Sequence, residues 1–130
     1  MATIKSYSDL EQSKKLAEIL PIESADMCYQ ARYDNKNNLK YIPRFVSTII
    51  PLKADIPCWS LAALINIIPQ ELFDGEYIIN ITEGIDNKWI ITYDHYKNRN
   101  HSFYGLSTGA DNLVDACYEM IIKLHEQNLL

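Results

Sequence analysis

A chain of 130 residues with 48% apolar and 22% charged side chains has the size and composition of a globular domain, which excludes a disordered or fibrous protein. The net charge of −5 disfavours nucleic-acid binding by the surface as a whole. The sequence shows neither an apolar run of about 18 residues nor a secretory signal, so we expect a cytoplasmic protein with no membrane contact.

The first expected element is a helix. Ser8 and Glu11 have the spacing of a capping box, in which side chains bind the free backbone amides of the first turn. Apolar residues then recur near helical spacing until Pro21, so the sequence predicts a helix over residues 9–20.

A β-hairpin is expected to follow this helix. Side chains alternate from Met27 onward as in a strand, and the polar residues 34–38 predict a turn. The return strand is expected over residues 39–50. Pro43 cannot donate to a sheet ladder, so this strand belongs at a sheet edge or contains a bulge.

A short apolar helix and a second hairpin are expected in the middle of the chain. Pro57 suits the first turn of a helix that ends at Pro69, and apolar residues on nearly all its sides predict that it is buried. Residues rich in β-branched and aromatic side chains predict strands over residues 76–83 and 88–96. Residues 102–107 are expected to add a third strand.

The last expected element is a regular helix. Apolar side chains repeat with helical spacing from Asp111 to Gln127, and Thr108 or Asp111 is expected to cap this helix. The order α-ββ-α-βββ-α predicts an α+β fold, with a single antiparallel sheet of about five strands and helices packed on one face. Residues 1–130 are expected to form a single domain.

The predicted core combines the middle helix, the second hairpin and the last helix. The period of each element selects the side chains that point inward. These are Trp59, Leu61, Leu64, Ile65 and Ile68, then Ile79, Ile81, Trp89 and Ile91, then Leu113, Cys117, Met120 and Leu124.

The most suggestive charge feature is a basic run in the first hairpin. Its members are Arg32, Lys36, Lys40, Arg44 and Lys53. Asp34 is the single acid between residues 28 and 53, and tyrosines alternate with the basic residues, as a surface for single-stranded nucleic acid requires. The alternative is a solvated edge hairpin whose basic side chains prevent edge-to-edge pairing.

Cys58 is the candidate nucleophile of the chain, and His95 or His101 could supply a base. Asp94 with these histidines could also bind a metal or transfer a proton. In both cases a structural role is the alternative. Cys58 would then be a small buried residue at a helix start, and the histidines would lie at a solvated strand end.

Metal and cofactor sites are not expected. Cys28, Cys58 and Cys117 show no CxxC spacing, which argues against a disulfide framework and a zinc site and favours reduced thiols. No phosphate-binding or dinucleotide-binding motif occurs, so no cofactor is predicted.

Two surface features could serve partner binding. The C-terminal half has an acidic run that could complement a basic partner or remain solvated, formed by Glu71, Asp74, Glu76, Glu83 and Asp86. Val114, Tyr118 and Ile122 widen the apolar arc of the last helix. They would be covered within the monomer by the first helix or Leu129-Leu130, or would form the interface of a two-fold homodimer.

The segment Pro57-Cys58-Trp59-Ser60-Leu61, the strands rich in tyrosine and tryptophan, and residues 115–121 carry a resemblance. Together they resemble small uncharacterised proteins encoded by prophages and mobile elements of Bacteroides-type gut bacteria. The likeness covers residues 9–130. It implies an accessory phage or mobile-element protein, and it brings no catalytic residues with it.

The absence of a catalytic constellation favours a non-enzymatic module that binds an unidentified protein partner. An accessory factor that binds nucleic acid through the basic hairpin of residues 28–53 is the first alternative. A small hydrolase that uses Cys58 or the two histidines is the second.

Overall fold

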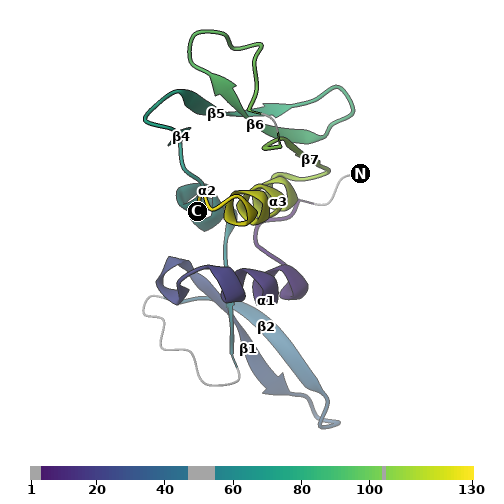
Figure 1. Cartoon of the computed structure of the whole chain (residues 1–130). Coiled ribbons are helices and arrows are strands. Elements are labelled where there is room, and N and C mark those ends of the chain that lie inside the picture. Colours follow the sequence, from purple (N-terminus) through teal and green to yellow (C-terminus); the bar gives the residue numbers. More distant parts are fainter. Residues whose placement is uncertain (1–3, 47–54, 104) are drawn as a thin grey trace. The chain divides into compact units, whose positions relative to one another are not determined.

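The computed structural model of the chain describes residues 4–46, 55–103 and 105–130 (Figure 1). Within these ranges it has three α-helices and two antiparallel sheets of three and four strands, with about 29% helix and 33% strand. The predicted α+β class is confirmed. The expected single sheet of about five strands is wrong, because the two hairpins lie in separate sheets. Each hairpin pairs instead with short strands from its own part of the chain.

The chain forms two compact units. The N-terminal unit consists of Ser6–Ala63, and the C-terminal unit of Met1–Lys5 with Leu64–Leu130. The former contains the three-stranded sheet and the latter the four-stranded sheet. The single-domain organisation stays a prediction.

The first helix of the N-terminal unit, α1 (Leu10–Ile19), is capped by Asp9. The Asp9 carboxylate accepts a hydrogen bond from the Gln12 amide at 2.8 Å, and the Gln12 side-chain oxygen accepts one from the Asp9 amide at 3.1 Å. The predicted capping box of Ser8 and Glu11 is wrong by one position. The Ser8 hydroxyl is buried and bonds to groups inside the unit, so it is not available to the helix end.

The sheet of the N-terminal unit has the order β2-β1-β3, and both pairings are antiparallel. Its strands are β1 (Met27–Tyr33), β2 (Leu39–Phe45) and β3 (Ile56–Cys58). The edge position that Pro43 predicted for β2 is confirmed. The part of the expected return strand beyond residue 46 lies outside the described residues.

The register of the hairpin explains how Pro43 fits in β2. The Asp34 amide donates to the Asn38 carbonyl at 3.0 Å, and the Val46 amide donates to the Asp26 carbonyl at 3.1 Å. Ladder bonds alternate along an antiparallel pair, so the even-numbered residues of β2 exchange bonds with β1. The amide hydrogen that Pro43 lacks would therefore face the outer edge, and its absence costs the hairpin no bond.

Trp59 and Ser60 join distant segments of the N-terminal unit. Trp59 is fully buried, and its indole N–H donates at 3.0 Å to the hydroxyl of the last residue of η1 (Ile22–Ser24), a short 3-10 helix. The amide and hydroxyl of Ser60 both donate to the Asp26 carboxylate. The Ser60 oxygen also accepts a bond from the first turn of α2 (Leu61–Ile67), and so caps that helix.

The helix α2 departs from its prediction in two ways. It begins after Pro57, which lies in β3 opposite Cys28. Leu64 and Ile68 are buried one turn apart, whereas Ile65 is 42% exposed. The expectation that the helix is buried on all sides is wrong, because this helix of seven residues leaves one side in solvent.

The sheet of the C-terminal unit has the order β4-β5-β6-β7, again antiparallel throughout. Its strands are β4 (Glu71–Leu72), β5 (Tyr77–Glu83), β6 (Trp89–His95) and β7 (Thr108–Ala110). The predicted hairpin of β5 and β6 is confirmed. The third strand expected over residues 102–107 is only partly right. Ser102 forms an isolated antiparallel bridge with Asp94, a turn with Gly105 at φ 85° follows, and the strand itself is β7.

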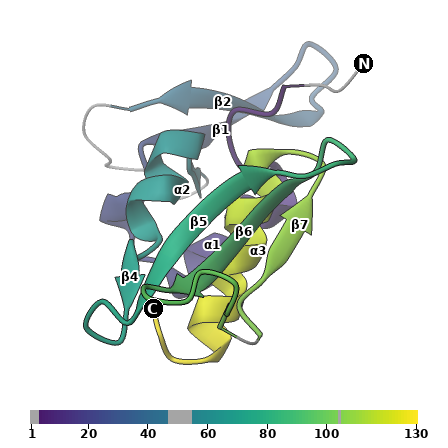
Figure 2. The same cartoon turned by 90° about the horizontal axis from the view of Figure 1, so that it is seen from above.

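The helix α3 (Leu113–Glu126) covers one face of this sheet (Figures 1 and 2). Asn112 caps it by accepting a hydrogen bond from the Asp115 amide at 2.9 Å. The expected cap residues, Thr108 and Asp111, do not have this role. The Thr108 hydroxyl is buried and donates to the Ala116 carbonyl at 3.2 Å.

Most of the predicted core is buried. The fully or nearly fully buried members are Trp59, Leu64, Ile68, Ile91, Cys117, Met120 and Leu124. The half-buried members are Leu61, Ile79, Ile81, Trp89 and Leu113. Among the helices of the described ranges, none combines the length and the apolar character that crossing a membrane requires.

Candidate functional site

The β1–β2 hairpin places its basic side chains on one face, together with Ile42, and its aromatic side chains on the other. Arg32 lies directly opposite Lys40, and Arg44 lies opposite Cys28. Residues opposite each other in an antiparallel pair point to the same side, and side chains alternate along each strand. Arg32, Lys40 and Arg44 therefore share one face, which we call the cationic face, and Lys36 lies in the turn.

The charges of the cationic face are largely uncompensated. Lys40 Nζ lies 3.7 Å from Asp34 Oδ2, and Arg32 donates to the Gln30 side chain at 3.4 Å. Among the described residues, neither Arg32 nor Arg44 forms an ion pair. Like charges directly opposite each other in a sheet are destabilising, so this arrangement is not explained by stability alone.

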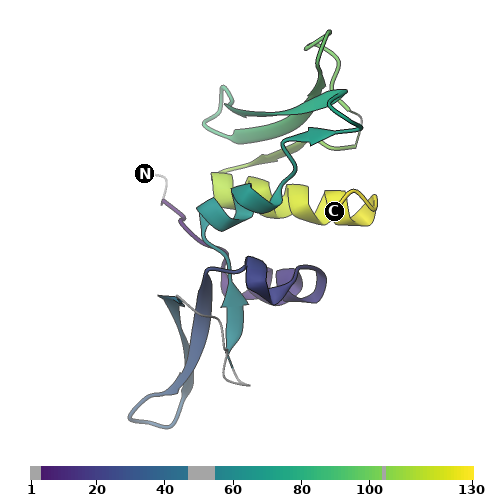
Figure 3. The same cartoon turned by 90° about the vertical axis from the view of Figure 1, so that its left-hand side faces the viewer.

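The opposite face of the hairpin, which we call the apolar face, bears Tyr33, Leu39, Tyr41 and Phe45. Tyr33 is 73% exposed and Phe45 is 74% exposed. Both are large apolar side chains, and Leu39 is exposed as well. Toward its tip the hairpin extends away from α1 within the N-terminal unit (Figure 3).

This separation matters for the predicted nucleic-acid surface. The candidate residues Arg32, Lys36, Lys40 and Arg44 are all exposed, and Lys53 lies outside the described residues. The tyrosines that were expected to alternate with them as stacking platforms face the other way. Tyr29 is buried, and its hydroxyl donates to the Ser8 carbonyl at 2.7 Å.

A second site lies at one end of the sheet in the C-terminal unit. A cavity of about 470 Å³ is lined by Phe73, Asp74, Gly75, Glu76, His95 and Tyr96. The ring centroids of His95 and Tyr96 are 5.0 Å apart. Tyr77 and Phe103, whose centroids are 5.2 Å apart, each pack against the Phe73 ring. We call this group the ring pocket.

The orientation of His95 in the ring pocket is fixed by the backbone. The amides of Lys97 and Asn98 donate to Nδ1 of His95 at 3.2 and 3.4 Å. These bonds need a lone pair on Nδ1, so the proton of the neutral ring is on Nε2. That nitrogen lies 3.9 Å from Glu76 Oε1.

The predicted group of Asp94, His95 and His101 is only partly brought together. The two imidazole rings lie 6.4 Å apart between centroids. Asp94 follows the alternation of β6 to the other face of the sheet, where it accepts bonds from three neutral side chains, those of Asn80, Thr92 and Ser102. It therefore stabilises the sheet instead of orienting a histidine.

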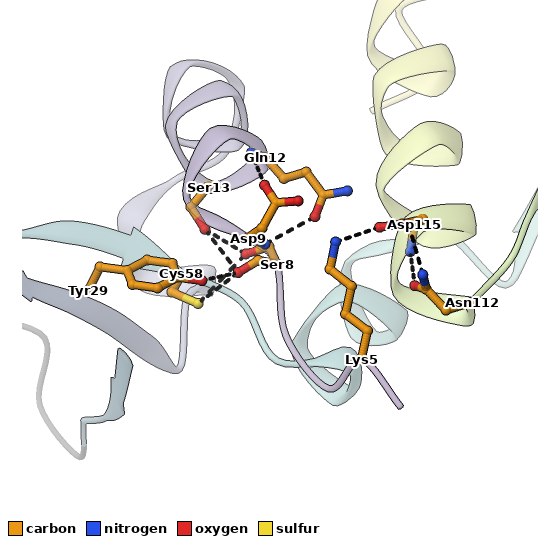
Figure 4. Close-up of polar contacts among 9 residues, drawn as sticks. All are labelled: Lys5, Ser8, Asp9, Gln12, Ser13, Tyr29, Cys58, Asn112 and Asp115. Atoms are coloured by element: carbon orange, nitrogen blue, oxygen red, sulfur yellow. Dashed lines mark hydrogen bonds and ion pairs between the residues drawn. The ribbon is translucent and has the colours of Figure 1, made fainter. Parts of the chain in front are cut away.

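Cys58 is buried in a polar cluster of the N-terminal unit (Figure 4). Its thiol donates to the Ser8 carbonyl at 3.4 Å and accepts from the Ser8 hydroxyl at 3.7 Å. Burial raises the pKa of the Cys58 thiol, although contacts with Ser8 and Ser13 oppose this shift. The unit contains no histidine that could act as a base. This environment suits a structural thiol better than a nucleophile.

The described residues contain no cluster of three or more metal-ligating side chains. Cys28, Cys58 and Cys117 are free and buried, and burial raises the pKa of the Cys117 thiol to about 12.

The apolar flank of α3 is partly used within the C-terminal unit. Val114 is fully buried, whereas Tyr118 and Ile122 are half-buried. A contact through this flank would therefore be made by Tyr118 and Ile122, and the homodimer stays a prediction.

Sequence reasoning missed most of the ring pocket. It treated Asp74 and Glu76 as members of an acidic run and did not single out Phe73, Gly75 or Tyr96. The Asp74-Gly75 dipeptide is a hairpin signal that could have indicated β4 and its turn. Comparisons with known proteins found no relative, since no family model, curated protein or solved structure matches the chain.

Proposed function

We propose that the protein is a non-enzymatic binding module that contacts an acidic protein partner through the β1–β2 hairpin. The observation that carries the proposal is the cationic face. Arg32 and Lys40 are held directly opposite each other, and Arg32 and Arg44 have no ion pair within the described ranges. A chain with a net charge of −5 that concentrates unpaired basic side chains on one hairpin face provides a local contact for a negative partner.

The apolar face supports a protein partner over a nucleic acid. Protein interfaces are enriched in arginine and aromatic side chains, and this hairpin offers both on its two sides. The hairpin could enter a groove of the partner, with Tyr33 and Phe45 against apolar surface and the cationic face against carboxylates. A nucleic acid would contact the cationic face through phosphates alone, because the described tyrosines of the hairpin do not share that face.

The cellular setting belongs to the same proposal. Three buried free cysteines fit a reducing compartment, which supports a cytoplasmic location. An accessory role in a phage or mobile element is supported by the sequence resemblance.

The test compares binding of a polyanion with a peptide backbone to binding of polyanions with a sugar–phosphate backbone. A labelled polyglutamate chain and labelled single-stranded and duplex oligonucleotides are titrated at low and at physiological salt by fluorescence anisotropy. We expect polyglutamate to bind more tightly than the oligonucleotides. The triple substitution Arg32→Glu, Lys40→Glu, Arg44→Glu should weaken binding by more than about tenfold.

The matched control reverses three exposed basic residues outside the hairpin, namely Lys14, Lys88 and Arg99. It makes the same change in net charge and should retain most of the binding. Oligonucleotides that bind more tightly than polyglutamate, with loss in the hairpin variant, would establish the nucleic-acid alternative. Equal loss in both triple variants, or no binding at low salt, would overturn the role of the hairpin.

A further inference from the structure

We propose that the ring pocket binds an alkylammonium group. Such a group occurs in small free amines and at the end of lysine side chains, and the chemistry that recognises it is the same. The pocket combines aromatic faces with carboxylates around a cavity of about 470 Å³, which lies within the usual size range of small-molecule sites.

The aromatic rings supply the first half of this recognition. Phe73 and Tyr96 line the cavity and are each 48% exposed, and His95 packs against the Tyr96 ring with centroids 5.0 Å apart. Cations are attracted to the faces of such rings within about 6 Å of the centroid. The chain already contains one example, because Lys97 Nζ lies 5.5 Å from the centroid of the Tyr96 ring, and a ligand cation on this face would replace the Lys97 ammonium.

The carboxylates supply the second half. Asp74 and Glu76 line the cavity, and the Glu71 carboxylate lies close to Gly75, where an added Cβ would meet its oxygen at 3.5 Å. Three acidic side chains thus surround one turn. A combination of negative charge and ring faces favours an organic cation, which the rings can contact with its methyl or methylene groups.

The turn that carries the pocket is held in a strained conformation. Phe73 and Asp74 have φ values of 54° and 55°, and Gly75 follows with φ 89°. A bulky residue in the left-handed region is unusual, and such strain is commonly found at binding sites. Phe73 is retained there by packing on Phe103, with centroids 5.3 Å apart. This packing places the Phe73 ring at the cavity before a ligand arrives.

The residues that line the cavity at the end of β6 are also held in place by hydrogen bonds. The Tyr96 amide donates to the Glu76 carbonyl at 3.0 Å, which ties the end of β6 to the turn. The backbone bonds to Nδ1 of His95 direct its Nε2 toward Glu76. A site whose side chains are already oriented loses little conformational entropy when it binds.

The experiment follows backbone amide signals of the isotope-labelled full chain by NMR. The probes are choline and its neutral isostere 3,3-dimethylbutan-1-ol, which has the same shape without the charge. We expect choline to cause saturable shifts at residues 73–76 and 95–97, and the neutral alcohol to cause none there. Equal shifts with both probes, or no saturable shift with choline at millimolar concentrations, would overturn the proposal.

Variants test the two halves of the site separately. Glu76→Gln removes a charge and Tyr96→Leu removes a ring, and each should weaken choline binding by about fivefold or more. Both residues are partly or largely exposed, so the fold should survive, and the amide spectrum reports this directly. Glu83→Gln, at the other end of β5, is the matched control and should bind as the wild type does.

Two further probes distinguish the sources of the alkylammonium group. Spermidine represents free amines, and a short peptide with trimethylated lysine represents a protein side chain. Tighter binding of the peptide would assign the pocket to a basic protein segment, and tighter binding of spermidine or choline would assign it to free amines. Binding in which Glu83→Gln is affected as strongly as Glu76→Gln would contradict the site.

Discussion

The β1–β2 and β5–β6 hairpins have the same local design and different surroundings. Each joins two seven-residue strands, and each turn is closed by an amide-to-carbonyl bond, from Asp34 to Asn38 at 3.0 Å and from Gly84 to Lys88 at 2.6 Å. Asn37 and Asn87 hold equivalent left-handed positions, with φ 60° and 58°.

The difference lies in what covers them. The inner face of β6 is buried against α3, with Ile91 and Tyr93 fully buried. The tip of β1–β2 instead exposes Tyr33 on one face and Arg32 and Lys40 on the other. Equal turn chemistry thus occurs in a hairpin with one buried face in one unit and in a hairpin with an exposed tip in the other.

The largest expected difference is in the free energy of unfolding when an apolar side chain is shortened to alanine, either in the helix that covers β6 or at the tip of β1–β2. Leu124→Ala in α3 should lower the free energy of unfolding by about 2–5 kcal/mol, because it leaves a cavity beside the buried face of the C-terminal sheet. Leu39→Ala, at the exposed tip of β1–β2, should change it by less than about 0.5 kcal/mol. Urea denaturation measures both. Similar losses in the two variants would show that the hairpin tip is buried in solution.

The two turns should respond alike to the loss of their left-handed asparagines. Asn37→Ala and Asn87→Ala should each cost about 1 kcal/mol, since alanine adopts positive φ at that cost. Thermal unfolding of the two variants, with Asn37→Gly and Asn87→Gly as controls, measures the effect. Glycine should restore most of the lost stability, and a failure to do so would indicate that the asparagine side chains act in another way.

Reversal of one charge on the cationic face should stabilise the hairpin while it weakens binding. Arg32→Glu places a carboxylate opposite Lys40, and an opposite-charge pair at that position contributes about 0.2–1 kcal/mol. Chemical denaturation and polyglutamate titration of the same variant give the two readouts. A variant that loses both stability and binding would mean that Arg32 has a structural role.

The smallest expected effect is a pH dependence confined to the first turn. The backbone amides of Asn38 and Lys36 donate to the Asp34 carboxylate and hold its pKa below the ordinary value. A carboxyl with a lowered folded-state pKa stabilises the fold above its unfolded pKa of about 3.9, and this stabilisation is lost as the pH falls through the lower folded value.

The variant Asp34→Asn should therefore be less stable than the wild type at neutral pH. The difference should shrink as the pH falls below about 4. Gly84 occupies the equivalent position in the other turn and offers no such carboxylate. A difference that stays constant across this range would assign the effect to something other than the charge of Asp34.

Elements with strong local signals could be predicted from the sequence. Alternation, helical spacing and turn residues are signals between residues that lie within a few positions of one another. These local signals predict the two hairpins, α1 and α3. The details that depend on distant contacts could not. The cap of α1 moved to Asp9 because Ser8 bonds to Trp59, 51 positions away, and α2 begins after Ser60 because Asp26 holds that residue.

For the candidate sites, too, the residue types could be predicted from the sequence, whereas their arrangement in space could not. The basic residues of the first hairpin were evident, but the register that puts them on one face and the tyrosines on the other is a property of strand pairing. The ring pocket needs Phe73 and Tyr96 to meet across the ends of β5 and β6, and the sequence separates them by more than twenty residues. Trp59 and Ser60 form structural hydrogen bonds within the N-terminal unit, to Ser24 and Asp26.

The most direct test of the hairpin as a contact surface is an NMR titration of the isotope-labelled chain with polyglutamate. The comparison of the two hairpins predicts shifts that saturate at the amides of residues 30–44, with little change at residues 77–95 of the β5–β6 hairpin. Shifts that centre on residues 77–95, or that spread evenly over the basic residues of the chain, would contradict the account.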